Sequence, residues 1–436
     1  MNAIRIALLG AGTVASGVVK VLERNQEEIR RRAGRGIEIV AVAARNPDKA
    51  RAALGSALPL TCDFHGLATR DDIDIVVELM GGIEPARSLV LAAIAAGKHV
   101  VTANKALLAQ CGNEIFAAAQ SRGVMVAFEA AVAGGIPIIK AVREGLAANR
   151  IEWVAGIING TTNFILSEMR DKGLDFATVL AEAQRLGYAE ADPTFDIEGV
   201  DAAHKITLLC SIAFGVPVQF DRAYVEGITR LDAADIRYAE QLGYRIKLLG
   251  ITRRTDAGIE LRVHPTLIPA SRLLANVEGA MNAVVVLGDA VGATLYYGKG
   301  AGSEPTASSV IADLVDVTRL HTADPEHRVP HLAFQPGALA DTPIAPMALV
   351  RSAYYMRVHV RDEAGVLAEI THILAEHGIS IDALLQRPSG ADDRHTAVIL
   401  LTHETVEGRM DQAQARIQAL DSVLAPIVRL RKEELR

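Results

Sequence analysis

The sequence contains few cysteines and few aromatic side chains. Among its 436 residues there are three cysteines, Cys62, Cys111 and Cys210, and only 4% of the residues are aromatic, so aliphatic side chains must fill the cores. The cysteines are odd in number, far apart and without CxxC or Cys/His ligand spacing. This pattern favours neither a disulfide framework nor a structural zinc site. We expect three buried free thiols.

Excess basic charge, long apolar runs and a targeting segment are also lacking. The formal net charge of −7 argues against binding to the phosphate backbone of nucleic acids. No stretch approaches the ~20 apolar residues that a membrane span needs. The chain passes from Met1 almost directly into the apolar run Ile4–Leu9, without the cationic segment and apolar core of a secretory signal. We therefore expect a soluble cytoplasmic protein with neither nucleic acid nor membrane as a partner.

Half of the residues are hydrophobic, and the length favours about three domains. In residues 1–150, short β-branched runs alternate with Ala-rich helical stretches. The expected strands are Ile4–Leu9, Ile37–Ala43, Ile73–Leu79, His99–Thr102 and Val124–Ala127. The expected helices are Val14–Arg32, Glu84–Ala96 and Lys105–Ser121. Such alternation predicts an α/β, Rossmann-type domain whose parallel sheet is covered on both faces.

Residues 151–320 read as an α+β substrate and dimerisation domain. The expected helices are Phe164–Gly187 and Ala202–Phe214. The expected antiparallel strands are Ile228–Arg230, Tyr244–Thr252, Glu260–Ile268 and Ala283–Leu287. Residues 321–350 read as a linker, because His321–Pro346 carries five prolines and turn-forming aspartates.

Residues 351–436 show the order βαββαβ of a small ferredoxin-like module. The expected strands are Tyr354–Arg361, Ile381–Gln386, Thr396–Thr402 and Val423–Leu430. The expected helices are Gly365–His377 and Val406–Ala419, and Pro388–Asp393 is an expected turn.

Gly10, Gly12, Thr13 and Val14 stand between the first expected strand and the first helix. Glycines at this turn allow pyrophosphate to approach the helix N-terminus, which predicts a dinucleotide site. The alternative is a glycine-rich connection in another doubly wound fold. Arg45 follows the second strand, where an NAD site usually has an acidic residue, so the sequence favours NADP while NAD remains possible. A solvated Arg45 is the alternative.

Residues 183–205 contain five carboxylates and Lys205. Asp201 and Lys205 are four residues apart and share a helix face. Nearby carboxylates could bind an ammonium group, and a lysine with a lowered pKa could protonate an alkoxide. A surface ion pair beside a solvated acidic turn explains the spacing equally well.

Residues 183–205 also resemble the homoserine dehydrogenase signature at every defined position. Further stretches resemble the same family: Gly10–Val14, Glu78–Gly82, Thr102–Leu107, Asn159–Asn163 and Gly300–Ala307. Ala15, in place of a third glycine, is the departure. The resemblance implies reversible hydride transfer between NAD(P)H and L-aspartate 4-semialdehyde, giving L-homoserine, on the route to threonine, methionine and isoleucine.

The resemblance also implies roles for individual residues. Lys205 is the implied proton donor, and Lys105 is a second active-site lysine that also contacts the cofactor. Glu190 and Asp201 are implied to hold the amino acid, with Asp196 supporting the site. The implied nicotinamide-side residues are Gly187 and Gly302. The implied structural sodium ligands are Glu129 and the carbonyls of Val132, Gly134 and Ile136. For that loop, a turn stabilised by Glu129 alone is the alternative.

Residues 353–430 resemble an ACT domain through Val360–Leu367 and Gly378–Ile381. This resemblance implies feedback regulation, with threonine bound near Asp362–Val366 across a dimer of such modules. The whole enzyme is then a homodimer or homotetramer. A purely structural dimerisation module is the alternative.

Three rival functions fit less well. An aspartate-semialdehyde dehydrogenase needs a cysteine nucleophile beside a histidine, and none of the three cysteines has such a setting. A fused aspartokinase would need a further domain before the dinucleotide site. A non-catalytic sensor predicts a degenerate segment between Glu190 and Lys205, yet those positions match the signature.

Overall fold

The computed structural model describes residues 2–55, 58–386 and 395–435. The expected turn at Pro388–Asp393 lies outside these residues. The chain forms two compact units. The first contains Met1–Gly160, Asp201–Ala223 and Met281–Thr342, and the second contains Thr161–Val200, Tyr224–Ala280 and Pro343–Arg436. Each is described by itself.

The first unit contains a six-stranded parallel sheet of order β3-β2-β1-β4-β5-β6. Its strands are β1 (Ile4–Leu9), β2 (Ile37–Ala43), β3 (Leu60–Thr61), β4 (Ile75–Glu78), β5 (His99–Thr102) and β6 (Val126–Ala127). The expected Rossmann-type sheet is confirmed. The strand order reverses between β1 and β4, which is where such sheets leave a crevice for a dinucleotide.

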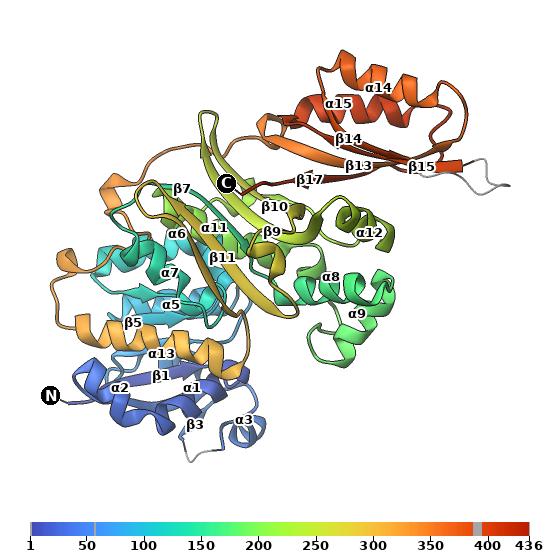
Figure 1. The fold of residues 1–436 in the computed structure, drawn as a ribbon. Helices are drawn as coiled ribbons and strands as arrows, with labels where there is room; N and C mark the ends of the chain where they lie inside the picture. Colours follow the sequence, from blue (N-terminus) through green and yellow to red (C-terminus); the bar gives the residue numbers. More distant parts are fainter. Residues whose placement is uncertain (1, 56–57, 387–394, 436) are drawn as a thin grey trace. The chain divides into compact units, whose positions relative to one another are not determined.

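Helices cover this sheet, as Figure 1 shows. They are α1 (Thr13–Arg24), α2 (Gln26–Ala33), α3 (Pro47–Leu54), α4 (Phe64–Thr69), α5 (Ala86–Ala95), α6 (Lys105–Arg122) and α13 (Ser303–Leu320). The single expected helix Val14–Arg32 is wrong, because the backbone leaves the helical conformation at Asn25 and starts again. Helix α13 packs against α1 although it lies far along the chain, and its buried Val310 and Leu314 share a core with Val18.

The rest of the first unit holds helix α11 (Val200–Phe214) and an antiparallel group of strands. Strands β7 (Ile151–Ile157), β11 (Met281–Gly288) and β12 (Gly292–Lys299) pair in the order β12-β11-β7. Helix α11 is buried on nearly every side, as its apolar composition predicts. Strand β12 was not expected. It is an edge strand with half-exposed Leu295 and exposed Tyr297.

The second unit begins with α8 (Gly160–Lys172), α9 (Phe176–Arg185) and the short α10 (Thr194–Ile197). Strand β8 (Tyr224–Val225) and helix α12 (Ala233–Gln241) precede the long hairpin of β9 (Tyr244–Thr255) and β10 (Gly258–Pro269). The expected helix Phe164–Gly187 is two helices, since Gly173 turns left-handed and Asp175 caps α9. The expected strand Ile228–Arg230 is also wrong, because the Ile228 amide donates to the Ile197 carbonyl instead of to a strand.

The C-terminal module has the expected βαββαβ order. It consists of β13 (Arg351–Arg361), α14 (Val366–Glu376), β14 (Ile381–Gln386), β15 (His395–Thr402), α15 (Glu407–Gln418) and β17 (Val428–Lys432). The antiparallel order is β17-β13-β15-β14. The last strand starts later than expected, after Pro426, which has no amide hydrogen to donate. Strand β17 also pairs in parallel with β10.

Candidate active site

The turn between β1 and α1 leaves backbone amides available to a ligand. Gly10 has φ +107°, and a Cβ there would lie 2.8 Å from the Leu79 carbonyl oxygen. Gly12 precedes α1, and no side chain caps the helix N-terminus or places a carboxylate in its first turn. This arrangement suits a pyrophosphate group. Ala15 is fully buried, so its methyl group is accommodated in the core.

Two further predicted cofactor residues lie in the same unit. Ser303 donates from Oγ to the Thr13 carbonyl at 2.8 Å, which places Gly302 beside the start of α1. Arg45 is exposed just beyond the end of β2. No ion pair of Arg45 is found among the described residues, so its guanidinium is accessible to an anionic ligand.

Two lysines from different helices meet at one buried carboxylate. Lys105 begins α6, whereas Asp201 and Lys205 are one turn apart on α11. Lys205 Nζ lies 2.6 Å from Asp201 Oδ2, and Lys105 Nζ lies 3.1 Å from Oδ1. Asn159 donates a further hydrogen bond to Oδ2 at 2.8 Å. The expected face-sharing of Asp201 and Lys205 is therefore present, inside the protein rather than at its surface.

Burial and the two lysines have opposite effects on the ionisation of Asp201. Burial disfavours the ionised form of Asp201, but Lys205 and Lys105 hold the pKa of its carboxyl well below the usual range. One carboxylate and two ammonium groups leave an excess positive charge. The Lys205 side chain is 10% exposed and also donates to the Ile158 carbonyl, whereas that of Lys105 is 35% exposed. Such a site favours a negative charge developing on a bound oxygen.

The buried carboxylate of Glu78 was not singled out from the sequence. Glu78, at the end of β4, accepts hydrogen bonds from Thr102 Oγ1 at 2.6 Å and from the Met80 amide at 2.7 Å. Asn104 caps α6 and donates to the Gly82 carbonyl at 2.7 Å. These bonds join the loop after β4 to the helix that starts at Lys105. The available sequence signal was a lone acidic residue at the carboxyl end of an apolar strand.

The other predicted substrate residues lie in the second unit. Asp196 accepts a hydrogen bond from Thr161 Oγ1 at 3.1 Å, and the same hydroxyl lies 2.7 Å from the Tyr188 carbonyl oxygen. Glu190 is exposed in the same loop, and Gly187 ends the preceding helix with φ +77°. These contacts give the acidic loop a defined shape.

Comparison with known proteins agrees with this geometry. Family models match at residues 10–129 (homoserine dehydrogenase, NAD binding domain), 137–315 (homoserine dehydrogenase) and 354–421 (ACT domain). A homoserine dehydrogenase of Pseudomonas aeruginosa is 62% identical, and one of Neisseria gonorrhoeae is 59% identical, each over 100% of both chains. The chain belongs to the homoserine dehydrogenase family. It is therefore an oxidoreductase with NAD-binding, catalytic and ACT domains.

Solved homoserine dehydrogenases share the fold. The crystal structure from Thiobacillus denitrificans is similar with a TM-score of 0.96 and 67% identity, covering 100% of this chain and 99% of that one. The structure from S. aureus at pH 7.5 has a TM-score of 0.76 and 34% identity, covering 99% of both chains.

In this homoserine dehydrogenase, the loop that follows β6 contains the buried acidic residue Glu129. Glu129 accepts from the amides of Ile139 and Lys140 at 2.8 and 2.9 Å, and its own amide donates to Asp313 at 2.7 Å. Burial, reinforced by Asp313, raises the pKa of Glu129 to about 7. Gly134 turns left-handed at φ +51°, and a Cβ there would lie 2.3 Å from the Gly300 carbonyl oxygen.

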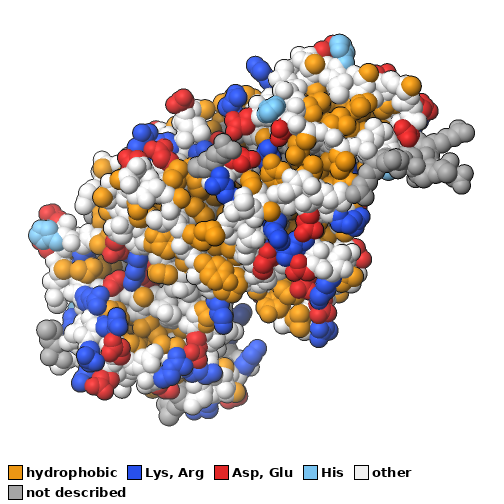
Figure 2. Space-filling model, viewed as in Figure 1, with side chains coloured by type: hydrophobic (Ala, Val, Ile, Leu, Met, Phe, Trp, Pro, Cys, Tyr) orange, Lys and Arg blue, Asp and Glu red, His pale blue; other side chains and the backbone are white. Residues whose placement is uncertain are grey.

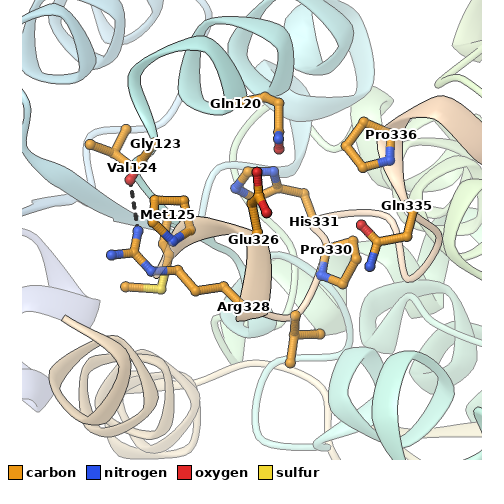
Figure 3. A pocket seen from close by; sticks show the side chains of 12 residues that line it. Gln120, Gly123, Val124, Met125, Glu326, Arg328, Pro330, His331, Gln335 and Pro336 are labelled. Carbon is orange, nitrogen blue, oxygen red and sulfur yellow. Dashed lines mark hydrogen bonds between the residues drawn. The ribbon is translucent and has the colours of Figure 1, made fainter. Parts of the chain in front are cut away.

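A cavity of about 330 Å³ lies apart from these residues (Figure 3). It opens between the end of α6 and the segment after α13, where Arg328 donates to the Gly123 carbonyl at 2.7 Å. Its twelve lining residues include none of the predicted catalytic, cofactor or cation-binding residues. The cavity thus lies where the linker after α13 packs against the end of α6.

The surface and cysteines complete the description of this homoserine dehydrogenase. On the face drawn in Figure 2, basic and acidic side chains are interspersed. No helix in the described part of the chain is both long and apolar enough to span a bilayer. All three cysteines are free, but the expectation that all are buried is correct only for Cys210, because Cys111 is half-buried and Cys62 is exposed just after the short edge strand β3.

Proposed function

We propose that the enzyme catalyses reversible reduction of L-aspartate 4-semialdehyde to L-homoserine with NAD(P)H, a step towards threonine, methionine and isoleucine. The observation that carries this proposal is the contact of Lys105 and Lys205 with opposite oxygens of the buried Asp201. The glycine turn would hold the pyrophosphate of a nicotinamide dinucleotide, which would supply the hydride. The aldehyde oxygen becomes an alkoxide that needs one proton, and an ammonium group beside it provides both the proton and charge stabilisation.

We assign each of these residues a separate role on the basis of its contacts and exposure. We assign proton donation to Lys205, and polarisation of the carbonyl oxygen to the more exposed Lys105. Asp201 contacts both lysines and accepts a hydrogen bond from Asn159, so we assign it the positioning of both ammonium groups. The family resemblance adds a share in substrate binding to this role. Glu190 pairs with the substrate ammonium group, and Asp196 holds the loop through Thr161.

The reaction is tested by initial rates of homoserine-dependent NADP⁺ and NAD⁺ reduction by the full chain, with and without threonine. Turnover establishes the activity and ranks the cofactors. No turnover with either cofactor, in sodium or in potassium buffer, rejects the proposal.

We propose NADP as the preferred cofactor, because Arg45 is exposed where a 2′-phosphate would lie. Arg45→Ala is expected to raise the KM for NADP⁺ roughly tenfold, the equivalent of about 1.4 kcal/mol, and to leave the KM for NAD⁺ nearly unchanged. Arg51→Ala, which removes an exposed arginine from the adjacent α3, is the matched control. An equal change for both cofactors would show that Arg45 does not contact the 2′-phosphate.

We propose a structural sodium ion held by Glu129 and the carbonyls of Val132, Gly134 and Ile136. The buried pair of Glu129 and Asp313 fits a cation, because burial raises the pKa of both carboxyls, that of Asp313 to about 6. Among the described residues no group of three His, Cys, Asp or Glu side chains is arranged for a metal. Carbonyl oxygens therefore supply the remaining ligands, which suits a hard ion.

This site predicts a pH-dependent effect of sodium. Because the folded pKa of Glu129 is raised, its ionisation costs stability as pH rises from about 4.5 through about 7. Sodium offsets that cost. In NaCl rather than choline chloride at equal ionic strength, Tm at pH 8 should rise by about 2–4 °C, and at pH 5.5 by less. Glu129→Gln should abolish the difference between the salts. Equal Tm values for the wild type in both salts at pH 8 would reject the site.

We propose feedback regulation by threonine at the ACT module, near Asp362–Val366. Gly365 precedes α14 with φ +100°, and no side chain caps that helix, so the amides that follow Val366 in its first turn are available to a carboxylate. We further propose a homodimer or homotetramer, because the edge strand β12 exposes Tyr297 and Leu295. The exposed free thiol of Cys62 is in keeping with a reducing cytoplasm, where we propose that the enzyme works.

A further inference from the structure

Glu78 is a buried carboxylate in the first unit to which the proposed reaction assigns no role. It ends β4 and is completely buried. Burial raises the pKa of its carboxyl, and no ion pair of Glu78 is found in the part of the chain that the structure describes. Burying a carboxylate without a positive partner opposes folding, because the charge loses its hydration. The hydrogen bonds of its two oxygens indicate what offsets this cost.

The two carboxylate oxygens of Glu78 hold two different segments. Oε1 accepts hydrogen bonds from the amides of Met80 and Gly81 at 2.7 and 3.3 Å, and these bonds shape the loop after β4. Oε2 accepts a hydrogen bond from Thr102 Oγ1, on the neighbouring strand β5, at 2.6 Å. The side chain therefore needs two acceptor atoms. A glutamine has only one acceptor oxygen, which explains why a carboxylate stands here in spite of its burial.

The Thr102 hydroxyl connects Glu78 to the start of α6. Its oxygen accepts a hydrogen bond from the Asn104 amide at 3.0 Å, while its hydrogen is donated to Glu78. Asn104 also donates from Nδ2 to the Gly82 carbonyl at 2.7 Å and caps α6 by accepting from the Leu107 amide at 3.1 Å. These hydrogen bonds fix both the backbone and the side chain of Asn104, and with them the first turn of the helix.

Lys105 directly follows Asn104 and is the first residue of α6. Its Nζ lies 3.1 Å from Asp201 Oδ1, and 35% of its side chain is exposed. Lysine has a flexible stem, so the position of the Lys105 backbone limits where the ammonium group can lie. A misplacement of about 1 Å is enough to lower a rate about a hundredfold. The first turn of α6 therefore has to be held accurately.

We propose that Glu78 is a positioning residue that acts through Thr102 and holds Lys105 in the orientation that the reaction needs. The carboxylate orients the Thr102 hydroxyl, the hydroxyl holds Asn104, and Asn104 sets the start of α6. All of these residues, and Asp201, belong to the first unit. The inference rests on the role of Lys105 in the proposed reaction. Loss of the connection lowers kcat without weakening dinucleotide binding.

Two substitutions of Thr102 test the connection directly. Thr102→Val has a similar shape but no hydroxyl, whereas Thr102→Ser keeps the hydroxyl. Glu78→Gln is a second variant, which keeps the shape of the side chain but removes one acceptor oxygen. The matched control is Thr252→Val in the second unit. Thr252 is also fully buried on a strand, and its hydroxyl donates to the Glu260 carbonyl at 2.8 Å.

Steady-state kinetics, NADP⁺ binding, Tm and amide hydrogen exchange are measured on the full chain. In Thr102→Val and Glu78→Gln, kcat for homoserine oxidation should fall about tenfold or more, and exchange over residues 103–110 should be faster. In Thr102→Ser, kcat should stay within about twofold of the wild type. The Kd for NADP⁺ should stay within about twofold in Thr102→Val, because Glu78 Oε1 still holds the loop after β4. Thr252→Val should lower Tm by a similar amount and leave kcat unchanged.

Retention of most of kcat in Thr102→Val would overturn the positioning role, and so would an equally large loss of kcat in Thr102→Ser. A rise in the Kd for NADP⁺ as large as the fall in kcat would place the effect at the loop after β4 and would also overturn it. If Glu78→Gln does not fold, the two Thr102 variants decide. The proposed reaction fails separately: absence of homoserine turnover by the wild type rejects that reaction, whereas unchanged exchange over residues 103–110 in Thr102→Val overturns the connection between Glu78 and α6.

Discussion

Replacing Lys205 by alanine is expected to lower kcat for homoserine oxidation by about a hundredfold or more, the usual contribution of a positioned general acid–base group. The Kd for NADP⁺ should stay within about twofold, because Lys205 lies on α11 and not at the glycine turn. The expected loss of kcat follows from the contacts that hold the Lys205 ammonium group in place. Lys205 Nζ is held by Asp201 and by the Ile158 carbonyl, so solvent cannot readily replace it.

Steady-state kinetics and dinucleotide binding measure this prediction. Lys172→Ala, which removes a half-exposed lysine on α8, is the matched control and should leave kcat unchanged. Lys205→Arg keeps the charge but has no readily released proton, and should not restore the rate. If Lys205→Ala retained most of kcat, proton delivery would belong to Lys105 or to water.

Replacing Asp201 by asparagine should damage both activity and stability. The substitution preserves shape but leaves two ammonium groups beside a neutral amide. Breaking a buried pair costs about 3–5 kcal/mol, so the free energy of unfolding at pH 7 should fall by several kcal/mol. The kcat should fall by about a hundredfold or more, since both lysines lose the group that positions them. Urea unfolding and steady-state kinetics measure the two effects.

The pH dependence of the free energy of unfolding distinguishes the loss of the Asp201 ion pairs from a loss of packing. The folded pKa of Asp201 is depressed, so its stabilising effect is present above the unfolded pKa of about 3.9 and is lost as pH falls towards the folded value. The stability gap between wild type and Asp201→Asn should be constant at neutral pH and narrow below about pH 4. Asp221→Asn, at an exposed position, is the control and should show no gap. A gap of the same size at pH 3 would indicate lost packing instead.

Local patterns in the sequence were enough to predict much of the architecture. The alternation of strands and helices up to Val126 predicted the parallel sheet, and the βαββαβ order predicted the C-terminal module. Errors occurred where one residue breaks a regular pattern. Asn25 and Gly173 each divide an expected helix, and the apolar run at Ile228 contacts Ile197 instead of forming a strand.

The candidate site was predicted only in part. The spacing of Asp201 and Lys205 indicated a shared helix face, but a surface ion pair explained it as well. Burial of α11 resolved that alternative. Glu78 was overlooked as an individual residue because its partner Thr102 belongs to a different strand.

The sequence by itself determined the Rossmann-type order, the glycine turn, the ACT-like module and, through the match over residues 183–205, the family. These properties depend on short-range periodicity and on motifs that are contiguous in the chain. Only the tertiary structure decided that Lys105 and Lys205 share one carboxylate, that α13 packs on α1, and that β17 pairs with both β10 and β13. Such contacts join segments far apart in the chain, and the packing of buried surfaces selects them, which no local pattern encodes.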